Sequence, residues 1–370
     1  MNSSIRIPAG SSPREFAESV VTRPSLALRA AESGWLPDVA IRWGIRARLA
    51  ELARELERGG AAAIATRTKQ LYDLMDQSPI AIATFESRAQ HYELPPSFFE
   101  LVLGPRRKYS CGFWPSHAPD LASAEIAALE LVFERAGLAD GQRVLELGCG
   151  WGSFCLNAAE RFPRSHVTAV SHSRPQRAHI EQAAQARGIS NLQVVTADMN
   201  DFVPSHAGRY DRIVSIEMFE HMRNWRRVLE SARTWLVNDG RLFLHVFCHR
   251  RVPYLFTERG SDDWMARNFF TGGVMPAEHT ARDFGERVGF RAASHWYLSG
   301  THYARTAEAW LAQLDRGRVD ALRILAATYG SRTAARIWLQ RWRMFFLACA
   351  ELWGYHSGDV WGVSHDVFTR

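Results

Sequence analysis

The stretch Val144-Leu-Glu-Leu-Gly-Cys-Gly-Trp-Gly-Ser153 decides how the rest of the chain is interpreted. Its short apolar run ends at Leu147, and three glycines follow: Gly148, Gly150 and Gly152. This order predicts a buried strand, a tight turn and a helix that opens at Ser153. Glycines in such a turn let the backbone bend sharply and let a ligand lie against bare peptide, near the amides of the helix start. Because a simple tight turn has the same pattern, the glycines alone do not identify a ligand.

The chain after this turn alternates between strands and helices. Strands are predicted at residues 143–147, 166–171, 192–196, 211–216 and 241–247, and late strands at 291–297 and 360–369. Helices are predicted at 153–161, 174–187, 225–236 and 277–288, with a helical insertion at about 303–355. Alternation of this kind is typical of a mostly parallel sheet with helices on both faces. The predicted fold class is therefore α/β, with a Rossmann-like sheet of seven strands.

The region before the sheet is predicted to be helical. Amphipathic or apolar spacing indicates helices at 37–58, 61–75 and 122–136, and another after the prolines at 95–96, while residues 1–34 suggest a loose arm. An aromatic-rich loop is expected at 106–115. We therefore expect an arm and helical lid region at 1–120, followed by an α/β domain at 121–370.

Composition narrows the class of protein. With 46% hydrophobic and 23% charged residues, the chain resembles ordinary globular proteins. No apolar run approaches the roughly 20 residues that span a bilayer, so no integral membrane contact is expected. The net charge of +6 comes from scattered arginines, which gives no indication of a nucleic-acid partner. The five cysteines form no CxxC pair, so we expect no metal site and a reducing, cytoplasmic location.

Polar residues follow each predicted parallel strand, where the carboxyl ends of neighbouring strands meet at one crevice. The second strand leads into Ser171-His-Ser-Arg-Pro-Gln176, the third into Asp198-Met199, and the fourth into Glu217-Met-Phe-Glu-His221. No acid follows the second strand to bind ribose hydroxyls. A nucleoside-type ligand fits this crevice, either a dinucleotide or S-adenosylmethionine.

Several motifs together resemble one superfamily, the cyclopropane fatty acid synthases and coclaurine N-methyltransferases. They are Glu146 with the Gly-Cys-Gly-Trp-Gly turn, Asp198-Met199, Tyr109-Ser-Cys111, Ser215-Ile-Glu-Met-Phe-Glu-His221 and Leu242-Phe-Leu-His-Val-Phe-Cys-His249. The resemblance runs from about Trp43 to the end of the chain, and it implies a class I methyltransferase that uses S-adenosylmethionine. The cofactor residues it implies are Tyr109, Ser110, Glu146, Gly148, Gly150, Gly152, Ser173, Gln176, Asp198 and Met199.

The cyclopropane synthase branch is understood to hold a bicarbonate ion that takes up a proton. Its ligands match Cys111, Glu220 and His245, but Glu217 stands where the synthases have glycine. The tyrosine that completes their bicarbonate site is missing from the matching helix, residues 343–350. A carboxylate beside a bare alkene would be poorly placed, because burying an uncompensated charge is costly.

The N-methyltransferase branch carries Glu-x-x-Glu-His where this chain has Glu217, Glu220 and His221. Asp262-Asp-Trp264 also resembles this branch, whereas Trp151 matches the synthases. The resemblance therefore favours an offshoot of the N-methyltransferases, acting on a small, partly aromatic amine. A homodimer is compatible with it.

An amine arrives at neutral pH mostly as an ammonium ion, which cannot attack a methyl group. If the strand leads directly into a helix, Glu217, Glu220 and His221 share one face. We expect the two carboxylates to anchor the cation and His221 to remove its proton, although these roles could be exchanged. A helix start with acids that complement its dipole is the simpler alternative.

The resemblance also implies substrate contacts at Tyr92 and Glu93, and aromatic walls that include Trp342 and Phe346. Two further functions stay open. One is methylation or cyclopropanation of an unsaturated lipid acyl chain, and the other is a non-catalytic protein that binds S-adenosylmethionine.

Overall fold

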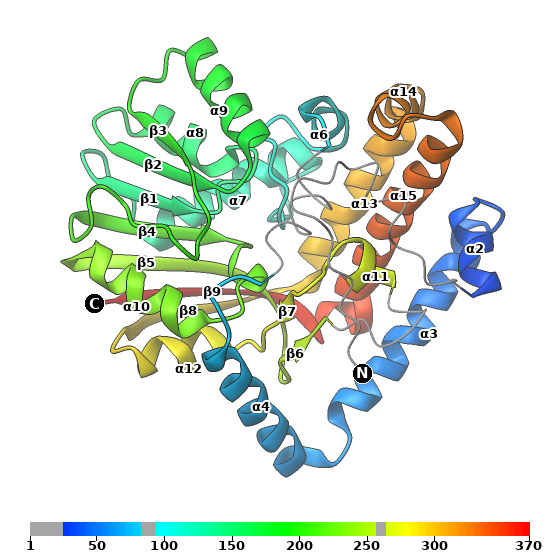
Figure 1. Ribbon diagram of the computed structural model, residues 1–370, viewed down its shortest axis with the longest axis horizontal. Helices are drawn as coiled ribbons and strands as arrows, with labels where there is room; N and C mark the ends of the chain where they lie inside the picture. The colour runs from blue at the N-terminus through cyan, green and yellow to red at the C-terminus, as the bar shows by residue number, and fades with distance from the viewer. Residues whose placement is uncertain (1–24, 83–93, 257–263) are drawn as a thin grey trace.

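A seven-stranded, mostly parallel sheet forms the centre of the molecule (Figure 1). The computed structural model describes residues 25–82, 94–256 and 264–370. The strands are β1 (Arg143–Leu147), β2 (His166–Ser171), β3 (Leu192–Thr196), β4 (Tyr210–Ile216), β5 (Leu236–His249), β8 (Arg291–Ser299) and β9 (Trp361–Thr369). They lie in the order β3-β2-β1-β4-β5-β9-β8, and β9 runs antiparallel to both neighbours. The predicted fold class is confirmed.

Helices cover both faces of this sheet, because its strands are apolar on both sides. One face packs against α7 (Leu121–Ala136), α8 (Ser153–Arg161) and α9 (Arg174–Ala186). The other face packs against α4 (Gly60–Gln77), α10 (Trp225–Trp235) and α12 (Thr280–Arg287). Successive residues of β1 illustrate the alternation, since Val144 belongs to the first apolar cluster and Leu145 to the second.

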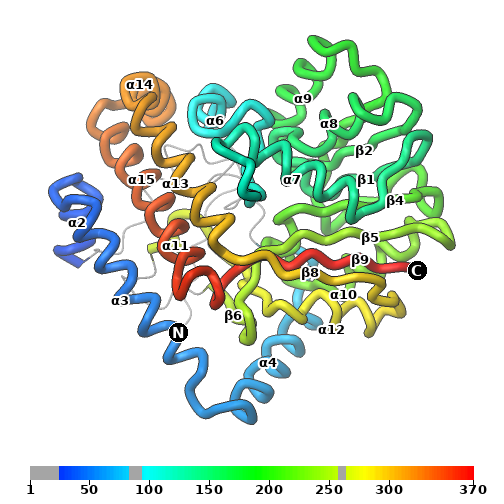
Figure 2. The backbone as a smooth tube through the Cα atoms, turned by 180° about the vertical axis from the view of Figure 1, so that it is seen from behind, coloured from blue at the N-terminus to red at the C-terminus, as the bar shows by residue number. Residues whose placement is uncertain are grey.

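A layer of further helices stands at the carboxyl ends of the parallel strands, away from the C-terminus (Figures 1 and 2). It contains α2 (Leu26–Glu32), α3 (Asp38–Glu57), α6 (Pro96–Val102), α11 (Trp264–Asn268), α13 (Gly300–Arg316), α14 (Arg318–Tyr329) and α15 (Arg332–Gly354). These helices share one apolar cluster with each other. The short elements η1 (Phe219–His221), β6 (Tyr254–Leu255), β7 (Val274–Met275) and η2 (Tyr355–Gly358) complete the described chain.

Helix α3 joins the N-terminal part of the chain to the late helices. The guanidinium of Arg343 on α15 bonds Asp38 at 2.8 Å, and Arg42 on α3 bonds Glu351 at 2.8 Å. At its far end Gly59 and Gly60 have φ of +84° and +66°, which turns the chain into α4 and back toward the sheet. None of the helices in the described ranges is long and apolar enough to cross a membrane.

Two sequence expectations were wrong in this region. Residues 26–32, expected to belong to a loose arm, form α2, whose Glu32 carboxylate accepts hydrogen bonds from Trp264 (2.9 Å) and Arg341 (2.8 Å). Strand β5 begins at Leu236 instead of residue 241, because it pairs with β4 there. The two-residue strands β6 and β7 were not predicted, since segments this short carry no periodicity.

Candidate active site

Three left-handed glycines shape the turn between β1 and α8. Gly148 has φ of +81°, and a Cβ atom there would lie 2.7 Å from the Cβ of Met218. Gly152, the N-cap of α8, has φ of +84°, and its Cβ would lie 2.8 Å from a side-chain carbon of Ile180. At Gly150, φ is +49° and no heavy atom lies within 4 Å of a Cβ position. The turn thus requires glycine for packing at two positions and leaves bare peptide at the third.

A cavity of about 1100 Å³, partly open to solvent, lies beyond the carboxyl ends of β1 to β4. We call it the sheet-edge cavity. Eight of the predicted cofactor residues line it: Tyr109, Ser110, Glu146, Gly148, Gly150, Gln176, Asp198 and Met199. Gly152 and Ser173 do not line it; they are the N-cap residues of α8 and α9. The strand ends predicted to converge therefore do converge on one cavity.

Unpaired polar atoms on the wall fit a polar ligand. The Glu146 side chain is buried, and burial raises its pKa to about 8. Its Oε2 atom and the Nε2 atom of Gln176 have no hydrogen-bond partner in the described part of the chain. The other end of the Gln176 amide accepts from Ser171 at 2.7 Å. Because an unpaired buried polar group costs about 1–3 kcal/mol, these atoms are suited to bind S-adenosylmethionine.

Asp198 and Met199 lie together after β3. The Oδ1 atom of Asp198 accepts hydrogen bonds from the backbone amide and the side-chain amide of Asn200, at 2.8 and 2.9 Å. Met199 packs at the edge of the apolar cluster under the sheet. A fixed carboxylate beside an apolar surface suits a ring with polar edges, such as a nucleoside base.

Sequence reasoning missed Lys108, which also lines the sheet-edge cavity. This lysine is 1% exposed, and its Nζ donates to the hydroxyl of Ser110. Burial lowers its pKa, an effect that the charge of Glu217 opposes. One feature of the sequence could have drawn attention to this residue, because Lys108 and Lys69 are the only lysines in the chain.

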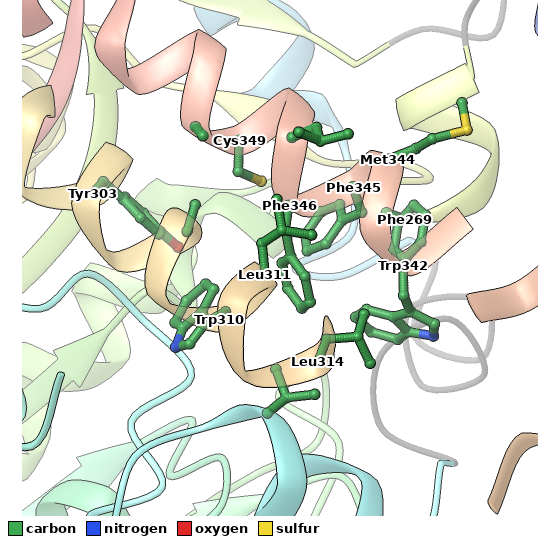
Figure 3. Packing of buried hydrophobic residues seen from close by; sticks show 14 of the residues in the cluster. Phe269, Tyr303, Trp310, Leu311, Leu314, Trp342, Met344, Phe345, Phe346 and Cys349 are labelled. Carbon is green, nitrogen blue, oxygen red and sulfur yellow. The ribbon is translucent and has the colours of Figure 1, made fainter. Parts of the chain in front are cut away.

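A second cavity of about 680 Å³ adjoins the first, and we call it the aromatic cavity. Its wall comes from β5, α13 and α15 and from the short elements between them: Phe247, Phe256, Met265, Phe270, Met275, Tyr303, Trp310, Phe345, Cys349, Leu352 and Trp353. Figure 3 shows four of these, Tyr303, Trp310, Phe345 and Cys349, within the packing of α13 against α15. Tyr109, Glu217 and His221 line both cavities, so these residues lie where the two cavities meet.

Glu217 is held at this junction by polar contacts with three separate segments. Its Oε1 atom accepts from the backbone amide of Cys111 at 2.8 Å and lies 3.1 Å from Nε2 of His245. Its Oε2 atom accepts from the Tyr303 hydroxyl at 2.6 Å. Burial raises the pKa of Glu217, and the charge of Lys108 and the hydrogen bonds from Cys111 and Tyr303 offset only part of that rise. These contacts favour the carboxylate form against the effect of burial.

One expectation about this site was wrong in geometry. Glu217 does not lie on a helix, because its φ of +50° breaks the path between β4 and the single turn of η1. Sequence reasoning also missed Tyr303 on α13, whose hydroxyl donates to Glu217. The left-handed backbone of Glu217 directs its side chain toward Cys111, an orientation that residue spacing does not predict.

Glu220 and His221 have different surroundings. Glu220 is fully buried behind the junction, and its Oε1 accepts from the backbone amide of Phe247 at 2.6 Å. Burial, followed by the nearby charge of Glu217, raises its pKa well above the ordinary value. The ring of His221 stacks on Phe270 at 5.4 Å and faces both cavities. Of the three residues expected to act together, Glu217 and His221 meet at the junction and Glu220 supports it from behind.

Two of the four predicted substrate residues belong to the described part of the chain. Trp342 and Phe346 are buried in the packing beside the aromatic cavity, where they contact each other at 5.7 Å, and neither lines it. Their neighbour Phe345 does line it. Tyr92 and Glu93 lie outside the described residues.

The sheet order and the cavity beyond its glycine turn define the class I S-adenosylmethionine-dependent methyltransferases, and the chain is an enzyme of this class. More narrowly, it belongs to the mycolic acid cyclopropane synthetase family, whose family model matches residues 81–363. S-adenosylmethionine is its cofactor.

Curated relatives and solved structures agree with this assignment. The chain is 35% identical to an (S)-coclaurine N-methyltransferase of Thalictrum flavum subsp. glaucum over 350 residues, covering 93% of this chain and 95% of that protein. A crystal structure of coclaurine N-methyltransferase bound to N-methylheliamine and SAH matches with a TM-score of 0.89 and 32% identity, covering 93% of this chain and 99% of that one. Cyclopropane mycolic acid synthase 1 of Mycobacterium tuberculosis is 27% identical, over 75% of this chain and 95% of that protein.

Proposed function

We propose that the chain transfers a methyl group to the nitrogen of a small, partly aromatic amine. One observation carries this proposal, the carboxylate of Glu217 at the junction of a cofactor cavity and a cavity lined by aromatic rings. An ammonium ion is attracted by the carboxylate and by the faces of the surrounding rings. The similarity to (S)-coclaurine N-methyltransferases over nearly the whole chain supports the same conclusion.

Each residue at the junction has a different role in this reaction. Glu217 holds the ammonium group near the sheet-edge cavity, and the rings of Tyr109, Tyr303 and Trp353 enclose the rest of the molecule. His221 accepts the proton that the ammonium must lose, because its ring faces both cavities. Glu220 keeps η1 against β5 through its bond with Phe247.

S-adenosylmethionine supplies a methyl group on a positively charged sulfur. Glu146, Gln176 and Asp198 would hold it in the sheet-edge cavity, with Gly150 leaving bare peptide beside it. Removal of the proton by His221 would leave the nitrogen lone pair free at the junction, beside the methyl group that S-adenosylmethionine would supply. Holding nitrogen and methyl in line contributes as much as the proton transfer, because both partners are already oriented.

A second candidate is methylation or cyclopropanation of an unsaturated acyl chain. The largely apolar wall of the aromatic cavity and the similarity to cyclopropane mycolic acid synthase 1 favour it. Glu217 argues against it, since an alkene offers no charge or donor to the carboxylate. A purely cofactor-binding protein would need neither Glu217 nor His221 beside the aromatic cavity.

Radiolabelled S-adenosylmethionine separates these functions. Purified protein is incubated with labelled cofactor and either a panel of small aromatic amines, which includes secondary and tertiary tetrahydroisoquinolines, or vesicles of unsaturated phospholipid. We expect label in at least one amine and none in the lipid. Label in the lipid and in no amine would overturn the proposal, and tight cofactor binding without transfer to any acceptor would favour the non-catalytic function.

A further inference from the structure

A line of hydrogen bonds leads from Glu217 along one face of the central sheet to Arg135 on α7. Nε2 of His245 lies 3.1 Å from Oε1 of Glu217, and Nδ1 of His245 lies 2.8 Å from Nε2 of His365. Nδ1 of His365 lies 2.7 Å from a terminal nitrogen of Arg135. Both histidines are at most 2% exposed, so these contacts are made in the absence of bulk water.

The sheet register produces this line. His245 on β5 is paired directly with His365 on β9, which places the two rings side by side on one face. His365 is in turn paired with Trp296 on β8. The guanidinium of Arg135, near the end of α7, lies over the Trp296 ring at 4.4 Å and is thereby aimed at His365.

The chemistry of arginine gives the line a direction. A guanidinium has only donors, so Nδ1 of His365 must be the acceptor and its proton must be on Nε2. That proton is donated to Nδ1 of His245, which places the proton of a neutral His245 on Nε2. His245 consequently donates to the Glu217 carboxylate. Every bond in the line points toward Glu217.

We propose that Arg135 and His365 are positioning residues that fix His245 as a hydrogen-bond donor and thereby keep Glu217 in its carboxylate form. This inference rests on the proposed function in one respect, namely that the Glu217 carboxylate binds an ammonium group. Neither Arg135 nor His365 lines the aromatic cavity or the sheet-edge cavity. They act on the substrate through His245 and Glu217.

Several other ionisable groups lie around Glu217 and influence its charge. Besides His221 and Tyr109, those around Glu217 in the described ranges are Lys108, Cys111, Glu220, His245, Tyr303 and Cys349. Burial, reinforced by the positive charges of Lys108 and Arg135, holds the pKa values of His245 and His365 well below the ordinary value. Both rings are therefore neutral at neutral pH, as the directed line requires.

The direction of the line can be measured without any substrate. Protein labelled with ¹⁵N-histidine is examined by long-range ¹⁵N–¹H NMR, and the two rings among the 14 histidines are assigned from His245→Gln and His365→Gln variants. We expect both rings to be neutral with the proton on Nε2 from about pH 6 to pH 9. A proton on Nδ1 of His245 in the unmodified protein would overturn the inference, whatever the enzyme methylates.

Kinetics test the consequence for Glu217. In Arg135→Met, the pKa of Glu217 rises further, so the acidic limb of the pH profile of kcat/KM for the amine moves to higher pH. At neutral pH we expect a loss of about tenfold, mainly through KM. Arg135→Lys, which keeps a charged donor, restores most of the activity, and His365→Gln keeps a nitrogen donor near the Nε2 position and loses less than His365→Leu.

Arg212→Met is the matched control, because Arg212 is also half-buried but, within the described part of the chain, bonds only the backbone oxygens of Gly137 and Asp211. It is expected to leave the acidic limb unchanged. An unchanged limb in Arg135→Met, with cofactor affinity and folding intact, would overturn the positioning role. A failed amine assay in the unmodified protein would instead count against the proposed function and leave the NMR result to decide the line.

Discussion

Glu217 and Glu220 carry the same side chain three residues apart, yet their surroundings differ. Glu217 has polar contacts with three segments, and the charge of Lys108 with the hydrogen bonds from Cys111 and Tyr303 offsets part of the rise in its pKa that burial causes. Glu220 has one bonded oxygen and one without a partner among the described residues, and its pKa is raised well above the ordinary value. At neutral pH we therefore expect Glu217 to be charged and Glu220 to be neutral.

This difference predicts unequal effects of the same substitution. Glu220→Gln replaces one neutral, hydrogen-bonding group by another, so kcat/KM for the amine should stay within about threefold of the unmodified enzyme. Glu217→Gln removes the charge and should lower kcat/KM by roughly 10²-fold. Steady-state kinetics on both variants, with cofactor affinity as the control, checks the pair. Equal losses would contradict the assignment of the anchor to Glu217.

His221 is expected to act as the base, and pH gives a signed test. Replacing it in His221→Asn removes the proton acceptor and should lower kcat by about 10²–10⁴-fold at neutral pH. As pH rises toward the pKa of the amine, more substrate arrives already deprotonated, so the gap between variant and unmodified enzyme should narrow. The measurement is kcat against pH for both proteins, and a gap that stays constant would rule out proton removal by His221.

At the scale of elements, the turn between β1 and α8 requires glycine at position 148, where the backbone is left-handed and a side chain has no room. In Gly148→Ala the new Cβ would clash with Met218 at 2.7 Å in a left-handed backbone, at a cost of about 1–3 kcal/mol. Cofactor affinity measured by calorimetry should fall and the melting temperature should drop.

Gly44→Ala provides the matched control for this substitution. Gly44 lies within α3 with no heavy atom within 4 Å of a Cβ position, and alanine there should stabilise the helix by up to about 1 kcal/mol. Unchanged cofactor binding in Gly148→Ala would mean that the turn tolerates a side chain and does not shape the cavity.

Local patterns predicted the elements well where burial decides them. β1, β2, β3 and α8 have the predicted bounds because each is an apolar run or amphipathic repeat that ends at a turn. The left-handed backbone at Glu217 was not predictable, since glutamate rarely adopts it and tertiary contacts impose it. The same limit applies to η1, a single turn that was expected to be a helix start.

At the scale of the molecule, the site is assembled from segments far apart in the chain. The partners of Glu217 come from Cys111, His245 and Tyr303, and the line behind His245 continues to Arg135. Motif spacing identified the strand ends, because parallel strands bring them together. It could not identify Tyr303 or Lys108, since nothing in the local sequence states which distant side chain reaches the junction.

The helical layer that walls the aromatic cavity depends on buried ion pairs. Arg343 on α15 is 13% exposed and bonds both Asp38 on α3 and Asp315 on α13. Arg343→Leu should reduce the free energy of unfolding by about 1–3 kcal/mol. Both acidic partners are 40% exposed, and solvent screening there makes the loss smaller than for a fully buried pair. Urea denaturation provides the measurement. Arg323→Leu, which breaks the exposed pair with Asp320, should cause no measurable change, and equal losses would contradict the bridging role of Arg343.

The central claim is that Glu217 recognises the positive charge of the acceptor amine. The most direct test compares, by calorimetry with S-adenosylhomocysteine present, the binding of a tetrahydroisoquinoline substrate and its isosteric analogue with carbon in place of nitrogen. The unmodified enzyme should bind the amine at least about tenfold more tightly, and Glu217→Gly should abolish that preference while retaining affinity for the cofactor product. Equal affinity for amine and carbon analogue in the unmodified enzyme would contradict the claim.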